Sequence, residues 1–174
     1  MAWLLVPFVV GLIADQATKQ WARGLQVVID EVWVVPGWLS FVHAQNTGAA
    51  FSTLPGFRWL FLGFTCLAVV VLMHLALAQP RSARAVPAVL GLILSGAVGN
   101  AMDRVRLGHV TDFIKVTVGH DGLAEAMVSL VGTRVWPIFN VADIALVVGV
   151  GLFSLHYVFE DDEAADVPPE PGPP

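Results

Sequence analysis

Two aspartates stand beside apolar runs that are long enough to cross a membrane. Asp112 comes after the run that begins at Val86, and Asp143 lies three residues beyond Asn140, at the start of the last run. A charged side chain at the middle of a membrane helix costs about 2.5–3.5 kcal/mol, so such residues face a protein interior or a water-filled cavity and mark functional sites. Two carboxyl groups a few Å apart share one proton, because both cannot ionise easily. Such a pair can activate water against a carbonyl group, and it titrates as a unit, which leaves the two roles unassigned.

Polar motifs stand at four ends of apolar runs, and the two aspartates belong to the last two motifs. Asparagines recur among them, and an asparagine side chain can donate and accept hydrogen bonds, so it can orient a carboxylate or bind a peptide backbone. In an up-and-down bundle of four helices these four ends meet on one side. The motifs are Asp15-Gln-Ala-Thr-Lys19, Asn46-Thr-Gly48-Ala-Ala-Phe51-Ser, Gly99-Asn100-Ala-Met-Asp103-Arg104 with Gly108-His-Val-Thr-Asp112-Phe, and Phe139-Asn140-Val-Ala142-Asp143.

Each motif also has a purely structural interpretation. Asp15 and Lys19 are four residues apart and share a helix face, so they form an ion pair near the membrane surface or brace the neighbouring segments. Asn46 begins an Asn-Thr-Gly turn, and it is equally a candidate for binding substrate. Asp103 and Arg104 can each pair with a neighbour instead of taking part in chemistry. The convergence of all the motifs on one side favours a functional site.

The composition is that of a membrane protein. Hydrophobic residues make up 56% of the 174 residues, charged residues only 13%, and the mean hydropathy is +0.73. Soluble domains use about 45–50% apolar and about 25% charged residues, so an ordinary soluble domain is excluded. The single cysteine excludes an intrachain disulfide and a cysteine-rich metal site. The absence of a basic patch argues against nucleic acid as a partner, and no cofactor is expected.

The apolar runs predict an all-α membrane protein with one integral domain over residues 1–160. Each of the four predicted spans, 2–23, 57–78, 86–104 and 136–159, has about the 20 residues that a crossing needs. β-branched stretches and a Pro-Gly turn within 26–51 predict a small extramembrane antiparallel sheet. Helical spacing of apolar residues in the extramembrane loop 105–135 predicts a short amphipathic helix before the last span. The acidic and proline-rich tail, 161–174, is expected to be disordered.

Aromatic residues support an even number of crossings, so both termini lie on the same side of the membrane. Four tryptophans, Trp21, Trp38, Trp59 and Trp136, fall on the side of the polar motifs, as in an aromatic belt. Charge does not decide the orientation. Arg81 and Arg84 mark the short loop after residue 78 as cytoplasmic, but the opposite side carries more lysines and arginines.

Three classes of function compete for these features. The first is an aspartyl peptidase that uses Asp112 and Asp143. The second is a small transporter or proton-conducting subunit with Asp15, Asp112 and Asp143 as relay sites, although a relay would place ionisable groups at several depths. The third is a structural bundle whose polar ends are merely interfacial. The sequence has no His-Glu-x-x-His and no Gly-x-Ser-x-Gly motif, which argues against a zinc peptidase and a serine hydrolase.

In order and spacing the four motifs resemble those of the bacterial lipoprotein signal peptidase family, also called signal peptidase II. The resemblance runs from the first span to the fourth and leaves out the acidic tail. It implies a multi-pass aspartyl endopeptidase of the bacterial inner membrane that removes signal peptides from prolipoproteins by cutting before the diacylglyceryl-modified cysteine. It also implies a site towards the outer leaflet, cytoplasmic termini, contact with membrane lipid, and inhibition by the cyclic peptide globomycin.

By motif position the resemblance places the catalytic dyad on Asp112 and Asp143. It also implies a set of residues that line or support the site and that need not take part in the chemical step. These are Asp15, Lys19, Asn46, Gly48, Asn100, Arg104, Asn140 and Ala142.

Overall fold

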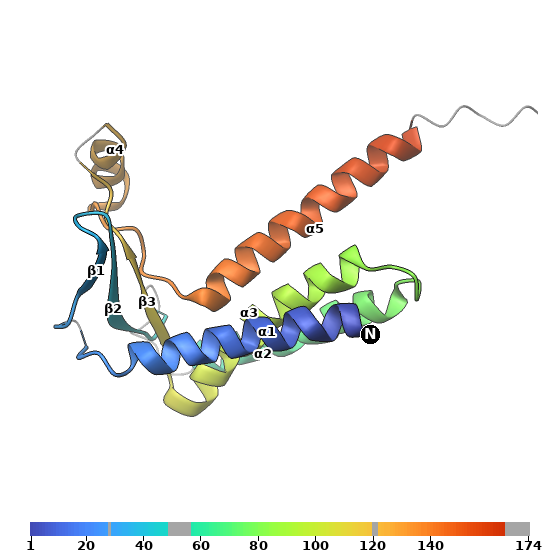
Figure 1. Ribbon diagram of the computed structural model, residues 1–174, viewed down its shortest axis with the longest axis horizontal. Helices are drawn as coiled ribbons and strands as arrows, with labels where there is room; N and C mark the ends of the chain where they lie inside the picture. The colour runs from blue at the N-terminus through green and yellow to red at the C-terminus, as the bar shows by residue number, and fades with distance from the viewer. Residues whose placement is uncertain (28, 49–56, 120–121, 166–174) are drawn as a thin grey trace, which may run out of the picture.

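The computed structural model describes residues 1–27, 29–48, 57–119 and 122–165 and contains four long helices, a three-stranded sheet and one short helix (Figure 1). The long helices are α1 (Ala2–Ala22), α2 (Phe57–Ala78), α3 (Ala85–Leu107) and α5 (Val141–Ala165). Within the described ranges these four helices are the ones long and apolar enough to cross a membrane. The predicted class, four spans with a small sheet and a short helix before the last span, is confirmed.

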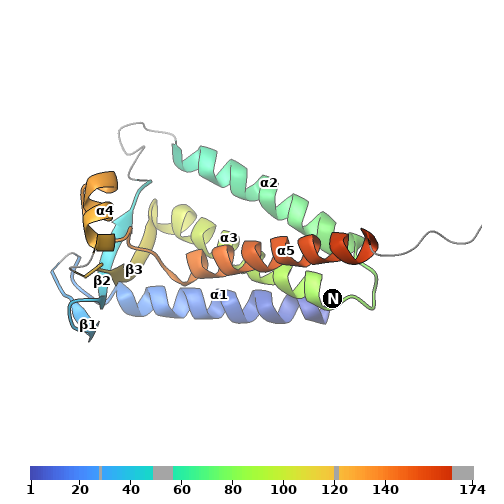
Figure 2. The ribbon, with the colours of Figure 1, turned by 90° about the horizontal axis from the view of Figure 1, so that it is seen from above.

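The helix α3 lies at the centre of the bundle and packs against α1, α2 and α5 (Figure 2). Glycines allow two of these approaches, because no side chain separates the backbones. A Cβ atom at Gly91 would overlap the carbonyl oxygen of Leu4 in α1, and a Cβ atom at Gly96 would overlap that of Ala142 in α5. The glycines of α3 therefore set how closely α3 approaches α1, which carries Asp15, and α5, which carries Asp143.

Substitution of Gly91 by alanine is expected to lower the thermal stability of the protein in detergent. The methyl group meets a backbone carbonyl that cannot move alone, and overpacking of this kind costs about 1–3 kcal/mol. Gly151→Ala is the matched control, because a Cβ atom at Gly151 has no neighbour within 4 Å. Thermal unfolding followed by circular dichroism checks the difference, and equal midpoints for the two variants would contradict it.

The sheet consists of β1 (Val32–Val35), β2 (Leu39–Asn46) and β3 (Val110–Val116), in the order β1-β2-β3 with antiparallel pairs. It lies with α4 (Gly122–Val131) at one end of the long helices (Figure 1). Edge-to-face contacts join Trp21 of α1 to Phe41 of β2 and Phe113 of β3, with ring centroids 5.4 Å and 6.3 Å apart. This aromatic cluster fixes the sheet on the end of α1.

The structure corrects several predicted boundaries. Of the β-branched stretches within 26–51, the first forms a single bridge among the described residues, between Val27 and His43, and the third strand comes from the loop 105–135. The span predicted over 86–104 extends to Leu107. The segment before α5 is extended and pairs with β3 through Phe139, so the last helix begins at Val141 and not at 136.

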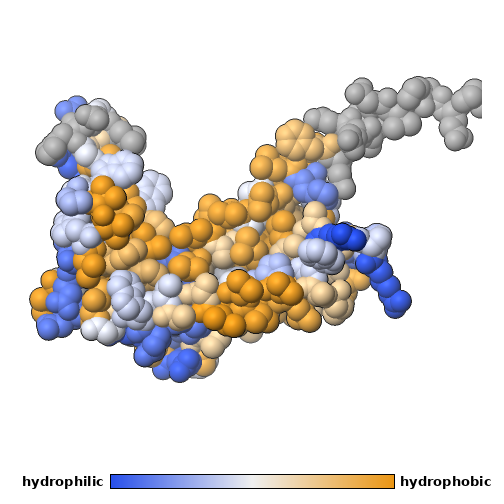
Figure 3. All heavy atoms as spheres, viewed as in Figure 1, coloured by the Kyte–Doolittle hydropathy of each residue, from blue (hydrophilic) through white to orange (hydrophobic). Residues whose placement is uncertain are grey.

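The backbone of α5 continues to Ala165, so the first residues of the predicted disordered tail are helical. The rest of that tail, 166–174, and part of the second motif, 49–52, lie outside the described residues. Apolar side chains cover the middle of the long helices, and the surface is hollowed between the sheet and the far part of α5 (Figure 3).

Candidate active site

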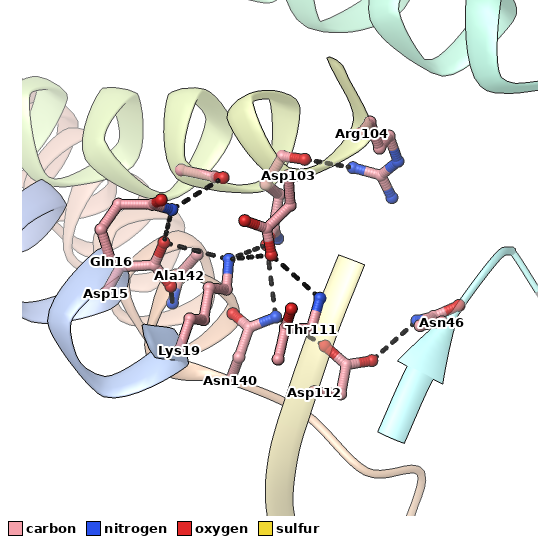
Figure 4. A network of polar contacts seen from close by, with 12 residues as sticks. Asp15, Gln16, Lys19, Asn46, Asp103, Arg104, Thr111, Asp112, Asn140 and Ala142 are labelled. Carbon is pink, nitrogen blue, oxygen red and sulfur yellow. Dashed lines mark hydrogen bonds and ion pairs between the residues drawn. The ribbon is translucent and has the colours of Figure 1, made fainter. Parts of the chain in front are cut away.

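Asp112 is held by two asparagines at the end of the sheet nearest the helices. It lies on β3, opposite Ala44 of β2, and only 2% of its surface is exposed. Asn140 donates a side-chain hydrogen bond to Oδ1 of Asp112 at 2.6 Å, and Asn46 donates one to Oδ2 at 2.9 Å (Figure 4). Both oxygens of the buried carboxyl group therefore have donors from different elements.

Asp143 lies in the first turn of α5 and is more accessible than Asp112. The backbone N–H of Asn140 donates to Oδ2 of Asp143 at 3.0 Å, and the backbone N–H of Asp143 donates to Oδ1 of Asn140 at 3.1 Å. This reciprocal arrangement is a capping box, in which an N-cap residue and the third helical residue satisfy each other's N–H groups. Asn100 of α3 donates to the remaining oxygen, Oδ1 of Asp143, at 2.9 Å.

Asn140 and Asn100 connect the two aspartates. The Asn140 amide, which binds Asp112, also donates to Oδ1 of Asn100 at 3.2 Å, and Asn100 in turn donates to Asp143. Asn140 is completely buried, so its orientation is set by these partners. The two carboxyl groups thus meet around one asparagine pair, contributed by α3 and by the N-terminus of α5.

Lys19 of α1 contacts the asparagine pair through Asn100. Its ammonium group is fully buried and lies 2.8 Å from Oδ1 of Asn100, 3.0 Å from Oδ2 of Asp15 and 3.6 Å from Oδ2 of Asp103 (Figure 4). The other oxygen of Asp15 accepts the backbone N–H of Ala142 at 3.0 Å. A carboxylate at a helix N-terminus is favourable because the N–H groups there carry partial positive charge. The first motif therefore ties α1 to α3 and to the start of α5.

Arg104 and Gly48 lie at the periphery of the site. The Arg104 guanidinium stands 5.1 Å from the centroid of the Phe61 ring of α2, and it donates to the carbonyl oxygen of Asn100 at 3.5 Å. Its hydrogen bonds reach neither aspartate. Gly48 has a φ of +88° and donates its N–H to Oδ1 of Asn46 at 2.9 Å, which fixes the amide that faces Asp112. A glycine adopts this left-handed conformation without strain.

The environment of Asp112 raises the pKa of its carboxyl group above that of an ordinary carboxyl group. Burial, and to a lesser extent the charge of Asp143, raise the pKa of Asp112 from 3.8 to about 6, while hydrogen bonds from Asn46 and Asn140 oppose the rise. A carboxyl group with this pKa can hold a proton in mildly acidic water and still release it near neutrality. The raised pKa therefore suits the Asp112 carboxyl group to acid–base chemistry.

An apolar pocket opens beside Asp143. Its volume is about 340 Å³, and it is lined by Trp136 and Phe139 before α5 and by Ile144, Val147 and Val148 on α5. The carboxyl group therefore borders a surface that suits an apolar chain. Within the described residues no three metal-ligating side chains of the His, Cys, Asp and Glu types gather.

Sequence reasoning placed all ten candidate residues at one end of the bundle, and the structure brings them together there. The sequence reasoning did not include Asp103, Arg23 and Thr111 among the site residues. Asp103 accepts from Arg23 at 2.6 Å and from the backbone N–H of Thr111 at 2.9 Å, which ties α1 and α3 to the strand that carries Asp112. The spacing of Asp103 from Asn100 on one helix was the available signal, whereas Arg23 and Thr111 become visible only through the fold.

Comparison with known proteins gives concordant similarities. The family described as "Signal peptidase (SPase) II" matches residues 7–159. The chain is 37% identical over 155 residues to a lipoprotein signal peptidase of Symbiobacterium thermophilum, covering 88% of this chain and 93% of that protein. It is 36% identical over 170 residues to one of Pseudomonas putida, covering 95% and 91%. A solved bacterial membrane enzyme superposes with a TM-score of 0.77 at 26% identity, covering 99% of this chain and 96% of the other.

Proposed function

Because the chain belongs to the signal peptidase II family of membrane peptidases, we propose that it is an aspartyl endopeptidase that acts on bacterial prolipoproteins. It removes the signal peptide by hydrolysing the peptide bond before the diacylglyceryl-modified cysteine. The observation that carries the aspartyl assignment is the pair formed by Asp112 and Asp143 around Asn100 and Asn140. The pair stands at the end of two membrane helices, beside an apolar pocket.

The proposed reaction uses the dyad with one shared proton. The ionised carboxyl group takes a proton from water as the water oxygen attacks the scissile carbonyl carbon, and the protonated group donates a hydrogen bond to the carbonyl oxygen. Collapse of the tetrahedral intermediate breaks the C–N bond, and the leaving amine receives a proton from the dyad. Burial raises the pKa of Asp112, which helps the dyad to keep a proton in the free enzyme, and the pair titrates as a unit.

The other candidate residues are proposed to position the dyad and the substrate. Asn46 and Asn140 orient Asp112, and Asn100 orients Asp143. Asp15 and Lys19 hold the helices, with Ala142 as the backbone contact, and Gly48 shapes the turn after β2. Arg104, whose guanidinium stands over the Phe61 ring of α2, is proposed to lie beside the substrate backbone.

The substrate and the location follow from the same proposal. The apolar pocket beside Asp143 accepts an apolar segment of the lipid-modified precursor, and the exposed apolar faces of the long helices give it access from membrane lipid. The protein is proposed to reside in the bacterial inner membrane with both termini in the cytoplasm and the dyad towards the outer leaflet. A globomycin-type cyclic peptide is proposed to inhibit it by occupying the dyad.

A cleavage assay tests this function directly. Purified protein in detergent is incubated with a diacylglyceryl-modified prolipoprotein, and the shift to the shorter product is followed on a gel. Cleavage is expected with the modified precursor, not with the same precursor carrying a free cysteine, and not after addition of globomycin. Failure of well-folded protein to cleave the modified precursor would contradict the proposal, and equal cleavage of both precursors would contradict the substrate assignment.

The rate of cleavage is expected to fall on the alkaline side of a pH profile, because the dyad loses its shared proton. The apparent pKa of this limb is expected near that of Asp112, about 6. Asn46 donates to the ionised carboxylate and so lowers the pKa of Asp112. Asn46→Leu removes this donor, so the limb is expected to move to higher pH. Profiles of log(kcat/KM) for wild type and this variant give the comparison.

The control for the pH profile is Glu31→Gln, which changes an exposed carboxyl group that contacts Lys115 on the sheet, away from the dyad. Its alkaline limb should coincide with that of the wild type. A limb that moves to lower pH in Asn46→Leu, or does not move, would show that the hydrogen bond from Asn46 does not set the titration.

A further inference from the structure

A second apolar groove lies between α2 and α3, separate from the catalytic site. Its volume is about 510 Å³, and it shares no lining residue with the pocket beside Asp143. Small side chains create the space, among them Thr65 and Cys66 on α2 and Ala101 on α3. The side chain of Cys66 is exposed on this surface. The groove is therefore open to the surrounding membrane and not sealed inside the bundle.

One cation stands at the end of this otherwise apolar groove. Arg106 lines the groove in the last turn of α3, at the same end of the bundle as the dyad. Within the described part of the chain its guanidinium forms no hydrogen bond or ion pair, and Asp103, one turn earlier on α3, pairs with Lys19 and Arg23 instead. Residues two apart on a helix face different ways, so Arg106 lies on a different part of the α3 surface from Arg104, whose guanidinium stands over the Phe61 ring.

The length of the groove indicates the kind of molecule that fits it. On α3 it runs from Val98 to Arg106, which is eight helical steps, or about 12 Å at the rise of ~1.5 Å per residue. One leaflet of a membrane has about half of the ~30 Å hydrocarbon core. The groove thus spans most of one leaflet and ends in a positive charge at its polar boundary, whereas a transmembrane helix would need the whole core.

From these observations we propose that the groove binds one phospholipid with an anionic headgroup, from the leaflet on the side of the dyad. An acyl chain lies between Leu62, Thr65 and Val69 of α2 and Val98 and Ala101 of α3, and the phosphate group pairs with Arg106. A guanidinium can bind phosphate oxygens through two parallel hydrogen bonds. Since α2 packs mainly on α3 among the long helices, the lipid extends the contact surface of this helix.

Native mass spectrometry of the full chain, released from detergent after incubation with phosphatidylglycerol or with phosphatidylcholine of the same acyl chains, tests the proposal. The wild type is expected to retain one phosphatidylglycerol in preference to phosphatidylcholine. Arg106→Gln is expected to weaken phosphatidylglycerol binding about fivefold or more and to abolish the preference. Arg106→Lys should restore part of it. Cys66→Phe fills the groove and is expected to reduce the retention of both lipids.

Two control variants separate the groove from general effects. Lys115→Gln makes the same change in net charge at the same end of the molecule, and it should retain phosphatidylglycerol as the wild type does. Val71→Phe adds the same ring to an exposed face of α2 outside the groove, and it should also bind normally. Circular dichroism verifies that each variant is folded.

Several outcomes would overturn the proposal. An unchanged lipid preference in Arg106→Gln would exclude Arg106 as the headgroup contact. Full lipid retention in folded Cys66→Phe would exclude the groove as the acyl site, and Ala101→Leu provides a second filling variant if the first does not fold. Displacement of the lipid by glycerol phosphate at equal concentration would show a site for soluble phosphate and not for a lipid.

Discussion

Replacement of either Asp112 or Asp143 by asparagine is expected to reduce kcat/KM for prolipoprotein cleavage by at least about 10³-fold, in the upper part of the range for the loss of a positioned acid or base. Each carboxyl group has a task that an amide cannot perform. An amide neither takes a proton from water nor returns one to the leaving amine. Because the two groups act as one unit, the kcat/KM of the double variant is expected to be no lower than that of the less active single variant.

The same substitutions should leave the fold intact. Asparagine has nearly the shape of aspartate. It keeps one oxygen for the hydrogen bond that Asn140 donates to Asp112, or that Asn100 donates to Asp143, and loses only the second accepted bond. Asp112 has a pKa that burial raises from 3.8 to about 6, so the folded state holds its proton more tightly than the unfolded chain. The stability that this proton provides is lost as the pH rises through this interval, and Asp112→Asn removes that pH dependence.

Cleavage assays and thermal unfolding of the same preparations check these expectations. Asp30→Asn is a matched control, since among the described residues its carboxylate accepts from the backbone N–H of Gln26 at the surface and from no group of the dyad. A dyad variant that folds and still turns over at the wild-type rate would remove that residue from the dyad. Variants that lose ion transport but retain cleavage would favour the relay interpretation instead.

Substitution of Lys19 by methionine is expected to destabilise the protein by about 3–5 kcal/mol, the range for removing one partner of a buried charge pair. Lys19 is completely buried, and its ammonium group lies within 4.0 Å of both Asp15 and Asp103. Arg23 still pairs with Asp103 after the change, but Asp15 loses its cation. Methionine fills a similar volume, so the loss reports the missing charge and not a cavity.

The loss of Lys19 is also expected to lower activity, because the ammonium group fixes Oδ1 of Asn100, which orients Asp143. Lys115→Met is the matched control. Its pair with Glu31 is partly exposed, and such pairs contribute about 0–1 kcal/mol. Thermal unfolding in detergent at several salt concentrations gives the comparison. Equal stability of Lys19→Met and Lys115→Met would mean that the buried cluster does not hold the helices together.

The linear sequence was sufficient for the class of protein and for most of the site. An apolar run of about 20 residues can satisfy its backbone hydrogen bonds in lipid as a helix and in few other ways. The four spans could therefore be predicted within a few residues. The polar motifs at their ends could be assigned to one side, because alternate helices of a bundle reverse direction. The short helix at 122–131 was visible from its spacing of apolar residues.

Tertiary structure alone revealed the strand that carries Asp112. The segment Val110–Val116 becomes β3 because β2 offers it an antiparallel partner, with Asn46 opposite Val110, and such long-range pairing leaves no local signal. Phe139 also pairs with Ile114 of β3. Because this residue is extended, α5 begins only at Val141, with Asn140 as its N-cap. Charge compensation is equally non-local, since Lys19, Asn100 and Asp103 meet only when α1 packs on α3. Spacing along the chain therefore predicts which residues share a helix face, whereas contacts between elements depend on how those faces pack.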